Sequence, residues 1–121
     1  MSRRVEKPWG HEIIWAHTDR YVGKLLFIRG GHKLSLQFHE FKDESIYLHS
    51  GRMLFTLGEG DELTVRTLQP GDSFRIRPGV THRMEAIEDS EVLEVSTPEL
   101  DDVVRLQDAY GRTDPGEKSS G

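Results

Sequence analysis

Residues 31–51 read GHKLSLQFHEFKDESIYLHSG, and this stretch carries the pattern that decides the fold. Leu34, Leu36 and Phe38 alternate with polar residues, which is the period-2 pattern of a strand with one buried face. A short polar connection leads to a second run of strand type at residues 45–49. The stretch therefore predicts two strands joined by a short loop.

The rest of the chain repeats this pattern of short runs separated by turns. Gly, Pro and Asp mark the turns, as in Pro70-Gly71-Asp72 and Pro78-Gly79. Many evenly spaced short strands are typical of an all-β barrel or sandwich. The expected strands cover residues 11–16, 21–29, 33–39, 45–49, 52–57, 62–67, 73–77, 82–87 and 91–96. Residues 100–110 are the one place where one or two helical turns are expected.

Length, charge and composition narrow the classes of function. The chain has 121 residues, no cysteine and a net charge of -5. Disulfides and thiolate metal sites are therefore excluded, and an acidic chain lacks the basic footprint of a nucleic-acid-binding protein. No apolar run approaches the roughly 20 residues that span a bilayer. The first residues lack the apolar core of a signal peptide, so we expect a cytoplasmic protein.

Four residues have the chemistry and spacing of a metal site. Gln37 and His39 are two positions apart in an expected strand, so they share one face. Glu44 opens the next strand, and His82 follows the Pro78-Gly79 turn, where a barrel could bring it alongside. This mixed nitrogen and oxygen set suits one divalent ion such as Zn, Mn, Fe, Co or Ni.

The same residues also allow a plainer interpretation. A single Gln-x-His pair is more often an exposed polar pair than a ligand pair. The remaining histidines have no partner at ligand spacing and are expected in surface or turn positions. They are His11, His17, His32 and His49.

Two motifs in the chain resemble those of the cupin superfamily. Gly31, Gln37, His39, Glu44 and Gly51 have the spacing of the first motif, G-x5-HxH-x(3,4)-E-x6-G, with glutamine at the first histidine position. The resemblance implies an all-β cupin double-stranded β-helix, or jelly-roll barrel, in a single domain.

The second motif, G-x5-P-x-G-x2-H-x3-N, is also nearly complete. Gly71, Gly79 and His82 match it, while Pro78 stands one place late and Ala86 replaces the asparagine. Two such motifs in one chain strengthen the metal-site prediction.

A closer resemblance extends over residues 5–112. The segments KPWG (7–10), LSLQFH (34–39), PGVTHR (78–83) and DVVRLQDAYGR (102–112) resemble the cupin domain of type II mannose-6-phosphate isomerases. That family uses a Gln-x-His pair as metal ligands, so the resemblance implies that Gln37 is a ligand. It also implies metal-dependent aldose–ketose isomerisation in carbohydrate metabolism. The resemblance does not extend to the guanylyltransferase half of the bifunctional members, so it does not imply nucleotidyl transfer.

The isomerase interpretation also predicts substrate-binding and catalytic residues. Lys24 shares a face with Leu26 and Ile28 by period 2, and a lysine on an apolar face is the leading candidate for a catalytic residue. Its alternative role is structural, with the ammonium reaching the barrel mouth. Arg105 and Arg112 are phosphate-binding candidates by family resemblance alone. Lys7-Pro8-Trp9-Gly10 is either a structural turn, with Trp9 capping the barrel, or part of the substrate site.

Other functions remain open from the sequence. The alternatives to an isomerase are an iron-dependent oxygenase and a non-catalytic sugar-binding cupin, because the cupin fold supports many functions. The expected partners are a small sugar or sugar phosphate and a second copy of the chain, with no nucleic acid and no membrane. The homodimer is expected because Trp9, Ile13, Ile14 and Trp15 place many apolar side chains near the N-terminus. Residues 1–112 are expected to form the domain and residues 113–121 a flexible tail.

Overall fold

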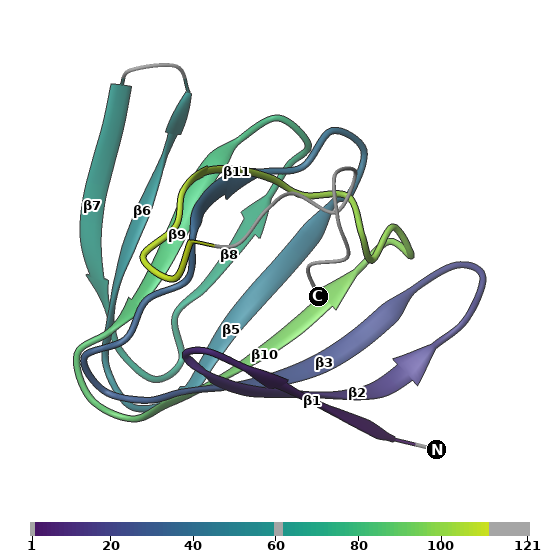
Figure 1. The fold of residues 1–121 in the computed structure, drawn as a ribbon, viewed down its shortest axis with the longest axis horizontal. Coiled ribbons are helices and arrows are strands. Elements are labelled where there is room, and N and C mark those ends of the chain that lie inside the picture. The colour runs from purple at the N-terminus through teal and green to yellow at the C-terminus, as the bar shows by residue number, and fades with distance from the viewer. Residues whose placement is uncertain (1, 60–61, 112–121) are drawn as a thin grey trace.

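The protein was analysed as a computed structural model that describes residues 2–59 and 62–111. Within these residues the chain forms eleven strands and no helix (Figure 1). The strands are β1 (Arg3–Lys7), β2 (Gly10–His17), β3 (Val22–Ile28), β4 (Leu36–Phe38), β5 (Glu44–Ser50), β6 (Met53–Glu59), β7 (Glu62–Leu68), β8 (Ser73–Ile76), β9 (Thr81–Ala86), β10 (Ser90–Ser96) and β11 (Val104–Gln107).

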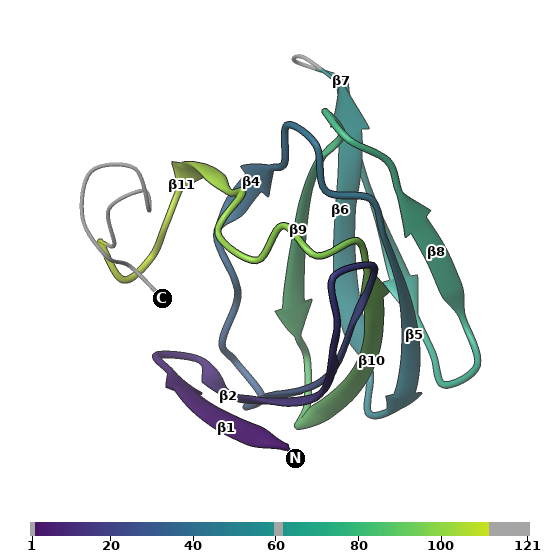
Figure 2. The ribbon, with the colours of Figure 1, turned by 90° about the vertical axis from the view of Figure 1, so that its right-hand side faces the viewer.

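The strands build two antiparallel sheets that face each other, as the two views in Figures 1 and 2 show. One sheet has the order β1-β2-β3-β10-β5-β8, and the other has the order β11-β4-β9-β6-β7. Strands far apart in sequence, such as β3 and β10 or β4 and β9, are hydrogen-bonded neighbours. This is the expected jelly-roll barrel in a single domain, and it brings residues near 40 beside residues near 80.

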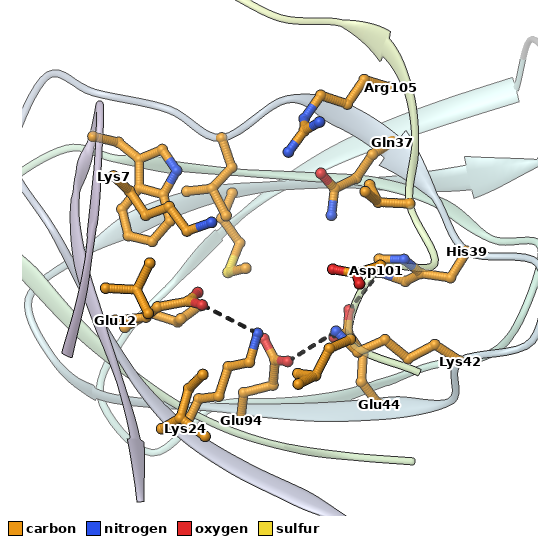
Figure 3. A pocket seen from close by; sticks show the side chains of 18 of the residues that line it. Lys7, Glu12, Lys24, Gln37, His39, Lys42, Glu44, Glu94, Asp101 and Arg105 are labelled. Carbon is orange, nitrogen blue, oxygen red and sulfur yellow. Dashed lines mark hydrogen bonds and ion pairs between the residues drawn. The ribbon is translucent and has the colours of Figure 1, made fainter. Parts of the chain in front are cut away.

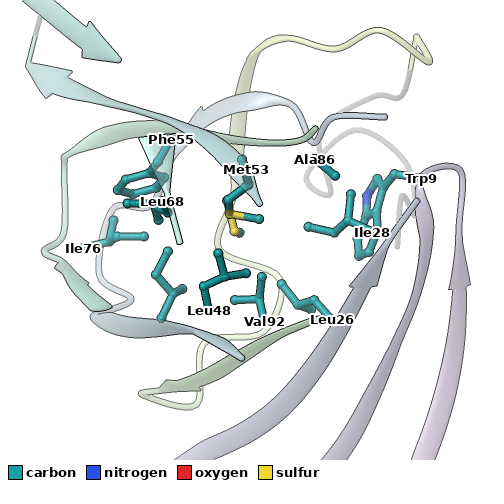
Figure 4. Close-up of a cluster of buried hydrophobic side chains, with 12 residues drawn as sticks. Trp9, Leu26, Ile28, Leu48, Met53, Phe55, Leu68, Ile76, Ala86 and Val92 are labelled. Carbon is teal, nitrogen blue, oxygen red and sulfur yellow. The ribbon is translucent and has the colours of Figure 1, made fainter. Parts of the chain in front are cut away.

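One end of the barrel interior is filled by apolar side chains from both sheets (Figure 4). Met53, Phe55 and Leu48 are 0–1% exposed, and the Phe55 and Phe74 rings lie 5.4 Å apart. The alternation of apolar and polar residues along the strands explains this apolar packing, because every second side chain of a strand points into the barrel. Trp9 is also buried and belongs to this cluster, which agrees with the structural role considered for the Lys-Pro-Trp-Gly segment.

The structure differs from the sequence-based expectations about secondary structure in three places. Residues 100–110 contain no helix; instead β11 pairs with β4, with Val104 opposite Phe38 and Arg105 opposite Gln37. This pairing satisfies the backbone groups along the edge of β4, which a helix would leave open. The charged segment Arg3–Lys7 was not expected to be a strand, yet it pairs along its whole length with β2. The strand expected at residues 33–39 is shorter, because only Leu36–Phe38 is regular.

The N-terminal apolar residues are divided between the core and the surface. Trp9 and Ile14 are buried, whereas Trp15 is 53% exposed. The homodimer stays a prediction, and only part of the apolar surface that motivated it is available to a partner. Among the described residues no helix is long and apolar enough to cross a membrane. The expected tail at residues 113–121 lies outside the described residues.

Candidate metal centre

His39, Glu44 and His82 come together from three elements of the chain. Their ligand atoms all lie within 4.8 Å of one another, and the residues are only 1–3% exposed. Glu44 Oε2 lies 3.2 Å from His39 Nε2 and 3.3 Å from His82 Nε2. The three residues therefore direct one carboxylate oxygen and two ring nitrogens at one point.

The strand register places the two histidines near each other. His82 is the second residue of β9, and its backbone lies opposite Gln37 in β4, two residues before His39. The turn before β9 is bonded to the same place, because the Gly79 N–H donates to the His39 carbonyl at 2.7 Å. Gly79 has a φ of 85°, which side-chain-bearing residues rarely adopt. The Pro-Gly turn of the second motif thus serves to hold His82 beside His39.

Backbone carbonyls fix the orientation of both rings. His39 Nδ1 lies 2.5 Å from the Asp102 carbonyl, and His82 Nδ1 lies 3.0 Å from the Val80 carbonyl. A carbonyl only accepts hydrogen bonds, so each Nδ1 carries the proton and donates it. Each Nε2 is then left with a lone pair that faces Glu44. This arrangement of the outer ring nitrogen is the usual one for histidines that bind metals.

The carboxylate of Glu44 is held in its charged form. Burial alone would raise the pKa of this carboxyl, but the charge of the Lys42 ammonium, 3.2 Å from Oε1, is the main opposing effect and holds the pKa well below its usual value. Lys42 is itself buried, and Glu94 and Glu44 together overcome the desolvation and raise the pKa of the ammonium. Glu44 Oε1 is thus occupied by Lys42, while Oε2 remains directed at the histidines.

The three donors fit a divalent ion. His82 Nε2 is buried and has no hydrogen-bond partner among the described residues. Two imidazole lone pairs that face a carboxylate oxygen repel one another unless a cation lies between them. Two nitrogens and one oxygen form a donor set that suits several divalent first-row metals. The identity of the metal does not follow from these three residues.

Gln37, the fourth predicted ligand, lies close to this cluster on the cavity wall. It comes from β4 and shares the inward side with His82, its register partner. Its side-chain oxygen accepts a hydrogen bond from the Ser35 hydroxyl. The structure thus places Gln37 beside the cluster with its amide oxygen engaged, and its role as a ligand stays a proposal.

The cluster opens into a cavity of about 200 Å³ (Figure 3). His39, Glu44 and Gln37 line one side of it, and Trp9, Leu26 and Met84 supply apolar wall. The remaining charged residues on its wall are Arg3, Lys7, Glu12, Lys24, Lys42, Glu94, Asp101 and Arg105. A cavity of this kind accommodates a small polar molecule in contact with the cluster.

Lys24 points into this cavity and is buried, as its period-2 face predicted. Its Nζ lies 3.4 Å from Glu12 Oε1, so a buried carboxylate accompanies the ammonium. A second buried pair joins Lys42 to Glu94 at 3.2 Å. Burial and the neighbouring Glu44 raise the pKa of Glu94 in spite of Lys42. The predicted candidate Lys24 is therefore one member of a row of buried charges that leads to the metal cluster.

Of the two predicted phosphate-binding residues, the structure describes one. Arg105 lines the cavity from β11, directly opposite Gln37 in the register. Arg112 lies outside the described residues. His11, His17, His32 and His49 do not belong to the cluster; His32, for example, lies 2.8 Å from the Tyr110 hydroxyl.

Sequence reasoning missed the residues that support the site. Asp102 accepts backbone N–H bonds from Glu40, Phe41 and Lys42 at 2.7–3.0 Å, while its own carbonyl receives the His39 ring. Asp102 lies more than 60 positions after His39 in the sequence, so the spacing of the motifs gave no sign that the two residues are in contact. Glu12 and Glu94 alternate with apolar residues on inward faces, as Lys24 does, and the same criterion could have found them.

The fold and the site define a class of protein, a small jelly-roll barrel with a buried His/Glu/His cluster that could hold a metal ion. The sequence comparison agrees with this class. The family described as "Cupin domain" matches residues 24–97, which include all three clustered residues. The chain belongs to the cupin family.

Relatives of known name match almost the whole chain. It is 35% identical over 116 residues to the xanthan biosynthesis protein XanB of Xanthomonas campestris pv. campestris, and 34% identical over 117 residues to a mannose-1-phosphate guanylyltransferase of Escherichia coli K12. These alignments cover 92% and 93% of this chain but only 24% of each relative. The chain thus spans about a quarter of the length of these relatives.

Solved structures show the same fold. KdgF from Halomonas sp. superposes with a TM-score of 0.71 at 28% identity, and the match covers 84% of this chain and 88% of KdgF. Oxalate decarboxylase from Bacillus subtilis superposes with a TM-score of 0.74 at 18% identity, over 87% of this chain and 30% of that protein. At that identity the second likeness supports the fold alone.

Proposed function

We propose that this cupin is a metal-dependent aldose–ketose isomerase that acts on a sugar or sugar phosphate, as mannose-6-phosphate isomerases do. The observation that carries the proposal is that the His39, Glu44 and His82 cluster shares one cavity with the Lys24–Glu12 ion pair. The resemblance of the two motifs to type II mannose-6-phosphate isomerases, and relatives named for mannose 1-phosphate, support the substrate class.

The cluster would hold the metal ion that serves as the electrophile in isomerisation. His39, Glu44 and His82 would hold the ion, with Gln37 as the fourth ligand. A bound divalent ion polarises a carbonyl and stabilises the negative charge that develops on its oxygen. Glu44 keeps its charge through Lys42, and the ring orientation is fixed by two carbonyls, so the site is prepared before substrate binds.

The Lys24–Glu12 pair can perform the proton transfers. The Glu12 carboxylate removes the proton from C2 of the aldose; the C–H electron pair forms the C1–C2 double bond, and the carbonyl pair moves to O1. Lys24 donates a proton to O1 and recovers one from the hydroxyl on C2. Glu12 then returns its proton to C1, which gives the ketose and restores both groups.

The decisive experiment offers mannose 6-phosphate, mannose and lyxose to metal-loaded protein and measures the ketose formed. Turnover should require the metal. Where the proton on Glu12 exchanges with solvent before it is returned, deuterium should enter C1 of the ketose, and C2 of the aldose in the reverse reaction. Lys24→Ala should lower activity while the metal content stays unchanged. Arg105→Ala should mainly raise KM for a phosphorylated sugar, because it removes binding rather than chemistry. Arg75→Ala is the control, since Arg75 pairs with Asp43 on the exposed surface.

A metal-loaded protein that interconverts none of these pairs would remove the isomerase function. It would leave the cupin family and the metal cluster as they are.

A further inference from the structure

Strand β7 forms one edge of the five-stranded sheet and lies at the margin of the molecule (Figure 1). On one side it pairs with β6 from Glu62 to Leu68 without a register shift. On its other side no described strand pairs with it, and its first six residues are exposed. The backbone N–H and C=O groups on that side are therefore a template for pairing with a further strand.

The other sheet edges are protected in ways that β7 is not. Four of the five residues of β1 are charged, and β8 and β11 have only four residues each. Short or highly charged edge strands discourage pairing with other chains. β7 has seven residues, no proline, no lysine and no bulge. Among the described edge strands, β7 is thus the one best suited to accept a partner strand.

The sequence of β7 is complementary to itself. When residues 62–66, Glu-Leu-Thr-Val-Arg, are aligned antiparallel to a second copy about Thr64, Glu62 lies opposite Arg66. In the same register Leu63 lies opposite Val65. Opposite charges, apolar pairs and Thr–Thr pairs are favourable across two strands. A register centred on Val65 would instead place Arg66 opposite Thr64 and separate the charges. The complementary register therefore indicates a second copy of this chain as the partner.

The side chains in this register are accessible and lie on consistent faces of the sheet. Leu63 and Val65 are 38% and 59% exposed and point to one face. Glu62 and Arg66 point to the other face, where the Arg66 guanidinium lies 5.0 Å from the centre of the Phe74 ring. A two-fold axis perpendicular to the sheet keeps each face continuous between the two copies. The charged pairs would thus form on one face and the apolar pairs on the other.

We propose that two copies of this chain pair antiparallel along β7, with Thr64 opposite Thr64, and join their five-stranded sheets into one sheet of ten strands. The resulting dimer is isologous, so each contact between the copies occurs twice. The proposal is independent of the proposed function, because the metal cluster and the cavity wall are built by other parts of the chain. It also uses a different surface from the homodimer expected from the N-terminal apolar residues.

Single-cysteine variants test the register, because the chain contains no cysteine. Thr64→Cys places two thiols opposite each other across the axis, and diamide oxidises them to one disulfide by accepting their two electrons and two protons. Thr67→Cys is the matched control, an exposed threonine of the same strand. Its two copies would lie about 20 Å apart along the paired strands, too far for a disulfide. On non-reducing gels, Thr64→Cys should give at least about tenfold more covalent dimer than Thr67→Cys.

Charge reversal tests the Glu62–Arg66 pairs, with the mass measured by sedimentation equilibrium at low salt. The wild type should dimerise with a Kd on the order of tens of micromolar, because one pair of strands makes a small interface. Glu62→Arg and Arg66→Glu each place like charges opposite each other twice, so each should raise the Kd by about tenfold or more. The double variant Glu62→Arg/Arg66→Glu restores the opposite charges and should recover the wild-type Kd. An equimolar mixture of the two single variants should recover it as well, because the pairs then form between unlike copies.

Arg4→Glu is the control for charge reversal, because it makes the same change at an exposed arginine on the β1 edge. It should leave the dimer Kd unchanged, and the metal content should be the same in all variants. Three results would overturn the β7 pairing: a wild type that stays monomeric at about 500 µM, well above the Kd expected of a small interface, equal cross-linking of the two cysteine variants, or no recovery in either the double variant or the mixture. A dimer that is dissociated by Trp15→Ser and not by the β7 variants would also overturn it, because its interface would lie on the N-terminal strands.

Discussion

The two ends of the barrel interior are built by the same strands but have opposite chemistry. At one end the inward residues are apolar and tightly packed, and at the other they are charged and line the cavity (Figures 3 and 4). The change occurs within two positions on each of three strands, from Leu26 to Lys24 on β3, from Ile46 to Glu44 on β5, and from Val92 to Glu94 on β10.

This difference separates the part of the barrel that stabilises the fold from the part that holds the proposed site. Burial of apolar area contributes roughly 25 cal/mol per Å². Buried ion pairs such as Lys42–Glu94 recover little more than the cost of removing both charges from water. Locally unfavourable choices concentrate at functional sites, so the charged end is where function is expected.

The largest expected effect is at the apolar end. Phe55 is fully buried and packs against Phe74, so Phe55→Ala should lower the free energy of unfolding by about 3–5 kcal/mol. The measurement is urea unfolding at pH 7. The metal content of the folded fraction should stay that of the wild type, and a parallel loss of metal would show that the two ends are not separable.

Single and double changes at the charged end should affect stability differently. Lys24→Met leaves the Glu12 carboxylate buried beside no cation and should cost about 3 kcal/mol of unfolding free energy. The double variant Glu12→Leu/Lys24→Met removes both charges. Its free energy of unfolding should lie within about 1 kcal/mol of the wild-type value or exceed it. Activity should be lost in both. A double variant as unstable as the single one would mean that this pair stabilises the fold.

The metal cluster should be sensitive to either histidine. His82→Ala removes one of three convergent donors, and since loss of an outer contact already costs about 10–100-fold in metal affinity, loss of a donor should cost about 100-fold or more. Gln37→Ala should weaken binding less. The control is His49→Ala, an exposed histidine that pairs with Glu91 outside the cluster. Dialysis followed by elemental analysis gives the stoichiometry, and full occupancy in a His39/His82 double variant would disprove the site.

Sequence patterns were most informative where one strand face is buried. Alternation predicted most of the strands, and it placed Lys24 on the inward face with Leu26, where the structure has it. Motif spacing selected His39, Glu44 and His82 from a chain with six histidines. These features are local or are repeated in a known motif, so a linear sequence can display them.

The residues that contact these side chains are set by the register in which the strands pair, and the sequence does not reveal that register. Glu12 meets Lys24 only because β2 and β3 pair with one particular alignment. Strand β1 was missed because four of its five residues are charged, so it lacks the apolar alternation that identifies a buried face. Residues 100–110 were expected to contain helical turns, but pairing of β11 with the edge of β4 decided their conformation.

The smallest predicted effect concerns the loop that carries His39. Burial would raise the pKa of the Asp102 carboxyl, but hydrogen bonds from three backbone N–H groups outweigh it and lower the pKa below the usual 3.8. A carboxyl with a lowered pKa in the folded state stabilises the fold above its unfolded pKa, and this contribution is lost as pH falls through the folded pKa. Asp102→Ala should therefore lower the free energy of unfolding by about 1–2 kcal/mol at pH 7, because the site is partly solvated. The difference from the wild type should shrink as pH falls below about 4.

Urea titrations at pH 7, 5, 4 and 3 measure this difference in unfolding free energy, with Asp101→Ala as the neighbouring control. A cost that is the same at pH 7 and pH 3 would show that the carboxylate charge does not hold this loop.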